Sequence, residues 1–96
     1  MFDKMKQLME MKKQADQIKR KLDVTDADVN EVSGVKITIN GSQCFKSIEI
    51  DDSLITIENK KNLQDSILKS LNAAIKASQS LAASEMKGML PGFPGL

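Results

Sequence analysis

The sequence predicts an α+β fold in the order α-β-β-β-α, in which a three-stranded antiparallel meander is flanked by long N- and C-terminal helices. Two patterns support this prediction. Apolar residues recur every three or four positions near both ends of the chain, as in amphipathic helices, and they alternate with polar residues in the middle, as in half-buried strands. A chain of 96 residues suits one small domain. We expect this domain to span residues 1–88 and to be followed by a Pro- and Gly-containing tail at residues 89–96.

The first helix is expected to run from Phe2 to Leu22. Its apolar residues are spaced three and four apart and form a narrow seam along one side. Two heptads are too few for a free-standing coiled coil, so the seam must pack on the rest of the domain or on a second copy of the chain. Met5 and Met9 lie beside this seam and form a second, shorter apolar strip. The seam comprises Leu8, Met11, Ala15, Ile18 and Leu22.

Three strands are expected in the middle of the chain. The clearest is Val35–Asn40, where apolar and polar residues alternate strictly. Asn40 and Gly41 should end this strand at a turn, because both residues tolerate a positive φ. The return strand should begin near Cys44 and end at Ile50. The less regular segment Val24–Val32 is expected to form the first strand, near an edge of the sheet because of its acidic residues.

A loop at Asp51–Glu58 should lead into the second helix, with Asn59 as its N-cap. We expect this helix to run from Lys60 to Lys87 and to end at Gly88. Two prolines exclude regular structure in the tail that follows. The apolar stripe of the helix comprises Leu63, Ile67, Leu71, Ala74, Ile75, Ser78, Leu81, Ala82 and Met86.

The predicted fold is a thin layer. The three strands offer only one apolar face. The apolar surface of the two long helices is larger than this face can cover. We therefore expect the molecule to be dimeric, because self-association would cover the surplus apolar helix surface.

The residues that most enzymes need are scarce. The chain has no His, which is the commonest general base and metal ligand, and no Gly-rich phosphate loop. Its single cysteine, Cys44, has no redox partner and is expected to be a small buried or half-buried residue. Without a signal peptide or a long apolar run, the sequence indicates a cytoplasmic protein. We therefore expect no enzyme activity, no cofactor and no membrane association. Two acidic clusters do not match a calcium-binding loop and give no metal site: Asp26, Asp28 and Glu31, and Glu49, Asp51 and Asp52.

The net charge of +1 hides an uneven distribution along the chain. Residues 1–22 carry seven bases and three acids (+4), residues 23–58 carry two bases and eight acids (−6), and residues 59–96 carry five bases and two acids (+3). Basic ends indicate a polyanionic partner. Solvated helix faces beside an acidic turn region would give the same distribution.

The positions of the basic residues extend this argument. Lys6, Lys13 and Arg20 are seven residues apart and lie opposite the apolar seam, in a row about 21 Å long. Lys12 and Lys19 form a parallel row on one flank, and the second helix carries a comparable set of Lys69, Lys76 and Lys87. Such rows can bind phosphates, or they can simply keep a helix soluble. Because Lys predominates and aromatic residues are few, a nucleic-acid partner would be duplex DNA bound through its backbone.

Five segments, in order along nearly the whole chain, resemble the YbaB/EbfC family of small bacterial nucleoid-associated proteins. They are the Met-, Lys- and Gln-rich helix Met1–Leu22, the strand and turn Ser33–Gly41, the return strand Ser47–Asp51 with Ser53 and Leu54, the helix centre Leu71–Ala77, and the ending Met86–Phe93. The resemblance implies a homodimer with protruding helices, DNA binding in the cytoplasm and at the nucleoid, and no catalytic residues. The DNA-binding positions that it implies are Lys6, Lys12, Lys13, Lys19 and Arg20.

Two loops depart from the family pattern. Members usually have Pro where this chain has Asp52, and a run of glycines where only Gly34 remains. The extra acid makes the Asp52 loop a poor DNA surface.

The sequence thus supports a nucleoid-associated homodimer that binds duplex DNA with low sequence specificity through phosphate contacts. The alternative is a non-enzymatic protein-interaction module, accessory to recombination or replication proteins, which would use the same helices and the Met-rich strip.

Overall fold

In the computed structural model, residues 2–89 are described. They confirm the predicted order α-β-β-β-α, with one short additional helix between the sheet and the last helix. The tail expected at residues 89–96 lies outside the described residues, apart from Met89. The elements are α1 (Phe2–Asp23), β1 (Asp26–Val32), β2 (Val35–Asn40), β3 (Phe45–Ile50), the 3-10 helix η1 (Asp52–Leu54) and α2 (Lys60–Met89).

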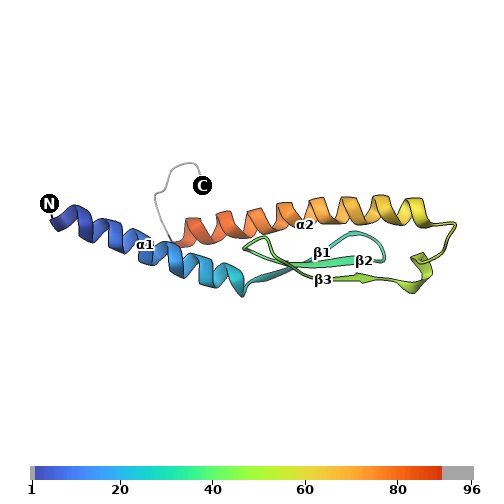
Figure 1. Cartoon of the computed structure of the whole chain (residues 1–96), viewed down its shortest axis with the longest axis horizontal. Coiled ribbons are helices and arrows are strands. Elements are labelled where there is room, and N and C mark those ends of the chain that lie inside the picture. The colour runs from blue at the N-terminus through green and yellow to red at the C-terminus, as the bar shows by residue number, and fades with distance from the viewer. Residues whose placement is uncertain (1, 90–96) are drawn as a thin grey trace.

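The molecule is long and narrow, with extents of 68 × 22 × 16 Å. Helix α2 runs along one face of the sheet, and α1 continues the long axis past the end of α2 (Figure 1). The two ends of the molecule are therefore different: the outer half of α1 forms one end, and η1 with the loop that follows it forms the other.

The core lies between α2 and the central strand. The sheet is antiparallel in the order β1-β2-β3, so β1 is at an edge, as its acidic residues predict. Alternate residues of β2, namely Val35, Ile37 and Ile39, are fully buried together with Ala74 of α2. Partly buried apolar side chains surround this cluster: Ala27, Val29, Leu54, Leu63, Leu71 and Ile75.

Both edge strands carry a β-bulge against β2. In β1, Val29 pairs with Ile37 but Val32 pairs with Val35, so an extra residue lies between the two pairs. In β3, Ser47 pairs with Thr38 but Phe45 pairs with Ile39, which leaves Lys46 as the extra residue. Each bulge returns an out-of-phase apolar residue, Val32 or Phe45, to the face that α2 covers. The bulge explains why the first strand looked irregular in sequence.

The third strand is only partly covered. Helix α2 packs on β1 and β2, whereas Phe45 and Ile48 of β3 remain 47% and 48% exposed. These two side chains border an apolar groove whose opposite wall is formed by Ile67 and Leu71 of α2. The single chain therefore leaves part of its apolar sheet face open to solvent.

The hairpin between β2 and β3 departs from the prediction. Strand β2 does end at Asn40, but the positive φ of the turn is at Gln43 (64°) and not at Asn40 or Gly41. Gly41 is instead buried against Leu22, because the hairpin passes close to the end of α1. Cys44 is exposed, so its prediction as a buried or half-buried residue was wrong.

The ends of α2 also differ from expectation. The helix continues through Gly88 to Met89, so Gly88 does not stop it. One glycine in a 30-residue helix lowers stability by only about 1 kcal/mol, which the rest of the helix tolerates. Asn59 precedes the helix as predicted, but its side-chain amide donates a hydrogen bond to the Leu54 carbonyl (2.8 Å). This bond ties the start of α2 to η1.

Candidate nucleic-acid interface

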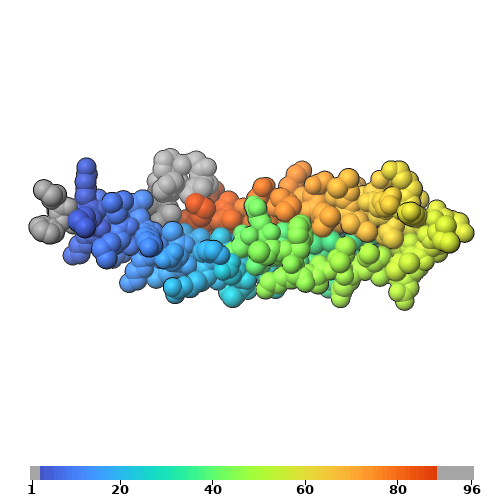
Figure 2. Space-filling view, viewed as in Figure 1, coloured from blue at the N-terminus to red at the C-terminus, as the bar shows by residue number. Residues whose placement is uncertain are grey.

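The apolar seam of α1 is covered only at its inner end. Ile18 and Leu22 are buried against the body, whereas Leu8 and Met11 are 65% and 61% exposed. Ala15, between them, is also exposed. A helix that buries only its last two seam residues must project from the domain, and the space-filling view shows the outer half of α1 standing clear of the sheet (Figure 2).

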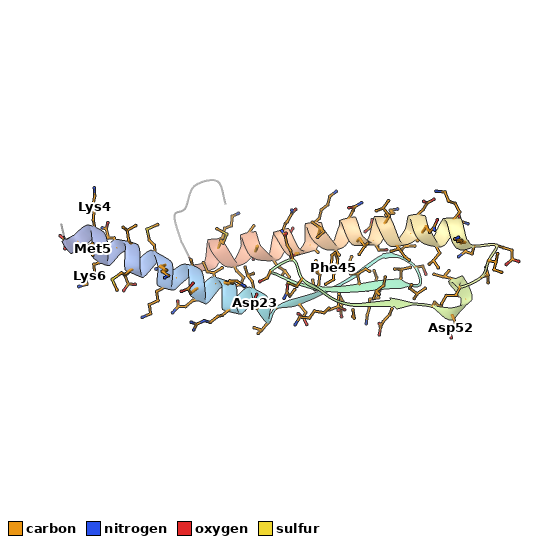
Figure 3. The ribbon with its side chains drawn as sticks, in the orientation of Figure 1. Lys4, Met5, Lys6, Asp23, Phe45 and Asp52 are labelled. Carbon is orange, nitrogen blue, oxygen red and sulfur yellow. The ribbon has the colours of Figure 1, made fainter. Side chains whose placement is uncertain are left out.

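Two bases of α1 do not belong to the predicted rows. The ammonium of Lys21 forms an ion pair with the Glu85 carboxylate of α2 (3.0 Å), which joins the inner end of α1 to α2. Lys4 leaves α1 on the side opposite to Lys6 (Figure 3). Helical periodicity accounts for both placements, because neither Lys4 nor Lys21 lies on the helix face that carries Lys6, Lys13 and Arg20.

The five predicted DNA-binding residues all lie on α1 with exposed side chains: Lys6, Lys12, Lys13, Lys19 and Arg20. Of these, Lys19 has a partner in the described structure, the Asp23 carboxylate at 3.3 Å, and its side chain is still 72% exposed. An exposed ion pair of this kind is worth less than about 1 kcal/mol, so a phosphate can displace the carboxylate.

Part of this basic surface is a shallow groove that the sequence did not reveal. Lys12, Lys13 and Arg20 line it together with Met9, and Asp16 lies among them. The carboxylate lowers the local positive potential. The sequence could have revealed this neighbour, because Asp16 is four residues from both Lys12 and Arg20. This spacing places the three side chains on adjacent turns of one helix face.

The second set of lysines has a different setting. Lys69, Lys76 and Lys87 are exposed on α2. The first two line a shallow depression together with Glu31 of β1, so an acidic strand lies beside them. Both sets of bases therefore have acidic neighbours: Glu31 beside the set on α2, and Asp16 and Asp23 beside the set on α1.

The Asp23 carboxylate connects the basic helix to the hairpin. It accepts a hydrogen bond from the Ser42 hydroxyl and the ion pair from Lys19. The hydroxyl is the main cause, and the ammonium a further one, of a pKa that is lowered from its ordinary value. Asp23 is thus ionised at neutral pH and fixes the last turn of α1.

The acidic clusters lie away from the basic helix or are paired. Asp52 lies at the end of the molecule opposite to Lys6 (Figure 3). Lys46 pairs with Asp26 (3.3 Å), and Lys36 pairs with Glu49 (3.0 Å), which raises the pKa of Lys36. Over residues 2–89, no three potential metal ligands come together.

Neither α1 nor α2, as far as the structure describes them, combines the length and apolarity that a membrane-spanning helix requires.

A thin α+β body with an exposed basic helix is typical of a small DNA-binding protein. The sequence model of the YbaB/EbfC DNA-binding family matches residues 1–93. The chain therefore belongs to the YbaB/EbfC DNA-binding family, which is not a family of enzymes.

The names of curated proteins of similar sequence agree with this assignment, and a solved structure shares the fold. The chain is 32% identical over 97 residues to a nucleoid-associated protein of Flavobacterium johnsoniae, covering 96% of this chain and 90% of that protein. It is 35% identical over 98 residues to a nucleoid-associated protein of Pelotomaculum thermopropionicum, with the same coverage of 96% and 90%. The crystal structure of an uncharacterised protein from Helicobacter pylori matches with a TM-score of 0.77 at 27% identity, covering 94% of this chain and 97% of that one.

Proposed function

We propose that this protein binds duplex DNA as a homodimer, with low sequence specificity, in the cytoplasm at the bacterial nucleoid. The names of its relatives support the location. The observation that supports the binding mode is the exposure of five bases on a helix that projects from the body. The folded unit is residues 1–88 together with Met89, to which α2 extends. The contacts are made to phosphates by Lys6, Lys12, Lys13, Lys19 and Arg20.

Low specificity follows from the kind of side chain on α1. Lysine presents a flexible point charge that binds phosphate but does not read a base pair, and Arg20 is the only arginine in the chain. Only three aromatic residues are available for stacking on unpaired bases. Duplex DNA bound along its backbone is the ligand that suits this surface.

The homodimer is supported by apolar side chains that a single chain leaves uncovered. They fall on the outer seam of α1, at Leu8 and Met11, and on β3, at Phe45 and Ile48. A second copy would bury all four, and it would present a second basic helix to the same duplex.

A protein-interaction module, accessory to recombination or replication proteins, is the second candidate. The observation that favours it is the exposure of Met5 and Met9, 64% and 71% respectively, on the same helix as the bases. Flexible methionines next to charge are suited to an acidic protein surface.

The deciding experiment compares two triple variants on unrelated random duplexes at several salt concentrations. Replacing Lys6, Lys13 and Arg20 with Ala should leave the fold intact, because all three side chains are exposed. Each lost phosphate contact should lower the slope of log affinity against log salt by about 0.9 per chain. Affinity should fall equally for duplexes of different sequence.

The matched control removes the same charge from α2, at Lys69, Lys76 and Lys87. We expect it to matter less, because residues 1–22 carry a net charge of +4 on a helix that projects from the body. If both triple variants lose the same affinity for DNA, net charge alone explains the binding, and the proposed site on α1 is refuted. No loss for either would leave the protein-interaction module as the better explanation.

A further inference from the structure

Within a single chain, the orientation of α1 is fixed only at its inner end. Every side chain from Asp3 to Lys13 is exposed, and the buried seam residues are Ile18 and Leu22. We propose that the tip of the β2–β3 hairpin, residues 40–43, is a positioning element that sets the direction of the basic helix and so determines how many phosphates it reaches. This inference rests on the proposed DNA binding.

The hairpin tip binds the C-terminal end of α1 directly. The amide of Gly41 donates to the carbonyls of Leu22 and Thr25, both at 3.0 Å. The side-chain amide of Asn40 donates to the Asp23 carbonyl (3.2 Å), and the Ser42 hydroxyl donates to the Asp23 carboxylate. The last carbonyls of a helix have no partner within the helix. The tip supplies a donor to the Asp23 carbonyl, and it adds a second donor to the Leu22 carbonyl, which also accepts from the Thr25 amide (3.3 Å).

The tip is itself held by α2. The hydroxyl of Ser78, which is fully buried, donates to the Asn40 carbonyl (2.8 Å) and accepts from the Gln43 amide (3.1 Å). The side-chain oxygen of Asn40 also accepts from the amides of Ser42 and Cys44, each at 2.9 Å. The tip thus forms a hydrogen-bonded joint between α1 and α2.

At Gly41 the joint leaves no room for a side chain. A Cβ at this position would lie 2.6 Å from Cδ2 and 3.3 Å from Cα of Leu22. The Cδ2 methyl of Leu22 can rotate away from the added Cβ. The Cα of Leu22 belongs to the helix backbone, so it can move only together with the last turn of α1. A single methyl group at Gly41 therefore pushes on the helix at its pivot.

The length of α1 amplifies such a shift. Lys6 is 16 residues from Leu22, or about 24 Å along the helix. A Cβ at Gly41 requires the Leu22 backbone to move by a few tenths of an ångström. A shift of about 0.5 Å over one turn of about 5.4 Å tilts the helix by about 5° and moves Lys6 by about 2 Å. A flexible lysine side chain can follow a small displacement of the backbone, so the loss of contact grows with distance from the pivot. Lys6 should lose its phosphate first, whereas Lys19 and Arg20, close to the pivot, should keep theirs.

The first test is Gly41→Ala, with Gly88→Ala as the matched control, since a Cβ at Gly88 meets nothing within 4 Å. On a random duplex, Gly41→Ala should make the slope of log affinity against log salt less steep by about 1 to 2 per chain, although every basic residue remains. Partial unfolding would instead reduce the affinity by the same factor at every salt concentration. The slope of log affinity against log salt would then not change. Circular dichroism at each salt concentration checks that the folded fraction is constant.

The second test measures the direction of the helix without DNA. Spin labels at Gln7→Cys on α1 and Gln79→Cys on α2, in a Cys44→Ser background diluted with unlabelled protein, report one distance within a chain. Gly41→Ala should shift this distance by about 2 Å, and Gly88→Ala should not. Ser42→Ala should broaden the distribution, and Ser42→Thr, which keeps the hydroxyl, should restore it.

The outcomes separate this inference from the proposed function. If wild-type protein binds DNA and Gly41→Ala changes neither the slope nor the distance, the inference is wrong. The helix is then held by a second copy or by its direct contact with α2, which includes the ion pair of Lys21 with Glu85. If the distance shifts but the slope does not, the direction of α1 has no part in binding, and the inference is equally wrong. If the wild-type protein binds no duplex at low salt, the proposed function fails, whatever the spin-label distances show.

Discussion

Asp23 and Ser42 show how one pair of side chains links a helix to a hairpin. Asp23 is the last residue of α1, and Ser42 lies 19 positions further along the chain at the tip of the β2–β3 hairpin. The hydrogen bond from the hydroxyl to the carboxylate is the main reason why the pKa of Asp23 is lowered. Neither residue forms part of a recognisable motif, so the sequence alone does not predict their contact.

The lowered pKa of Asp23 predicts a pH dependence. A carboxylate with a lower pKa in the folded chain than in the unfolded chain stabilises the fold above about pH 4, and this contribution is lost as the pH falls through the folded value. The wild type should therefore lose more unfolding free energy between pH 6 and pH 3 than Ser42→Ala does. Urea titrations at a series of pH values measure this difference. Parallel curves for the two proteins would contradict it.

At the scale of elements, periodicity was sufficient for both helices and for β2. The seam residues Ile18 and Leu22 are buried as predicted, and Val35, Ile37 and Ile39 form the core. The basic residues of α1 are exposed as their spacing predicts, because one face of a regular helix follows directly from the sequence.

What periodicity missed depends on contacts between distant segments. A bulge inserts one residue, so the strict alternation of a strand cannot describe Val32 or Phe45. Gly41 is needed for its close approach to Leu22 and not for the positive φ that an Asn-Gly pair suggests. The joint at the hairpin tip could not be predicted either, because it requires the packed positions of α1, α2 and the hairpin together.

The one-sided core of β2 predicts unequal effects for two neighbouring residues. Ile37→Ala should lower the unfolding free energy by about 2–5 kcal/mol, because it removes a fully buried side chain under α2. Lys36→Ala should change it by less than about 1 kcal/mol, since the exposed ion pair with Glu49 contributes little. Denaturant titration of both variants tests the contrast, and similar losses would mean that the second face of the sheet is also covered.

For the whole molecule, the partly covered third strand is the feature with most consequence. Light scattering at micromolar concentration should give about 21 kDa, twice the 10.6 kDa of one chain. Ile48→Asp should shift the mass to that of a monomer, because it places a charge on the apolar face of β3. Its side chain is half-exposed in the single chain, so the fold should survive the change.

Ser47→Asp is the matched control for the dimer. It adds the same charge one position away, on the opposite face of the same strand. Its mass should remain that of the dimer. A wild-type monomer that keeps its helix content would refute the dimer, and equal dissociation by both variants would refute β3 as the contact face.

The two bulges also bear on how the protein stays in solution. A sheet with two open edges can add further strands and grow into fibrils, and flat edges do so most readily. Here both edge strands are bent by an extra residue, and both carry charge, from Asp26, Asp28 and Glu31 on β1 to Lys46 and Glu49 on β3. A strand from another molecule would find neither a straight row of backbone groups nor a neutral one. The irregularities that place Val32 and Phe45 on the apolar face of the sheet thus also protect this small sheet against aggregation.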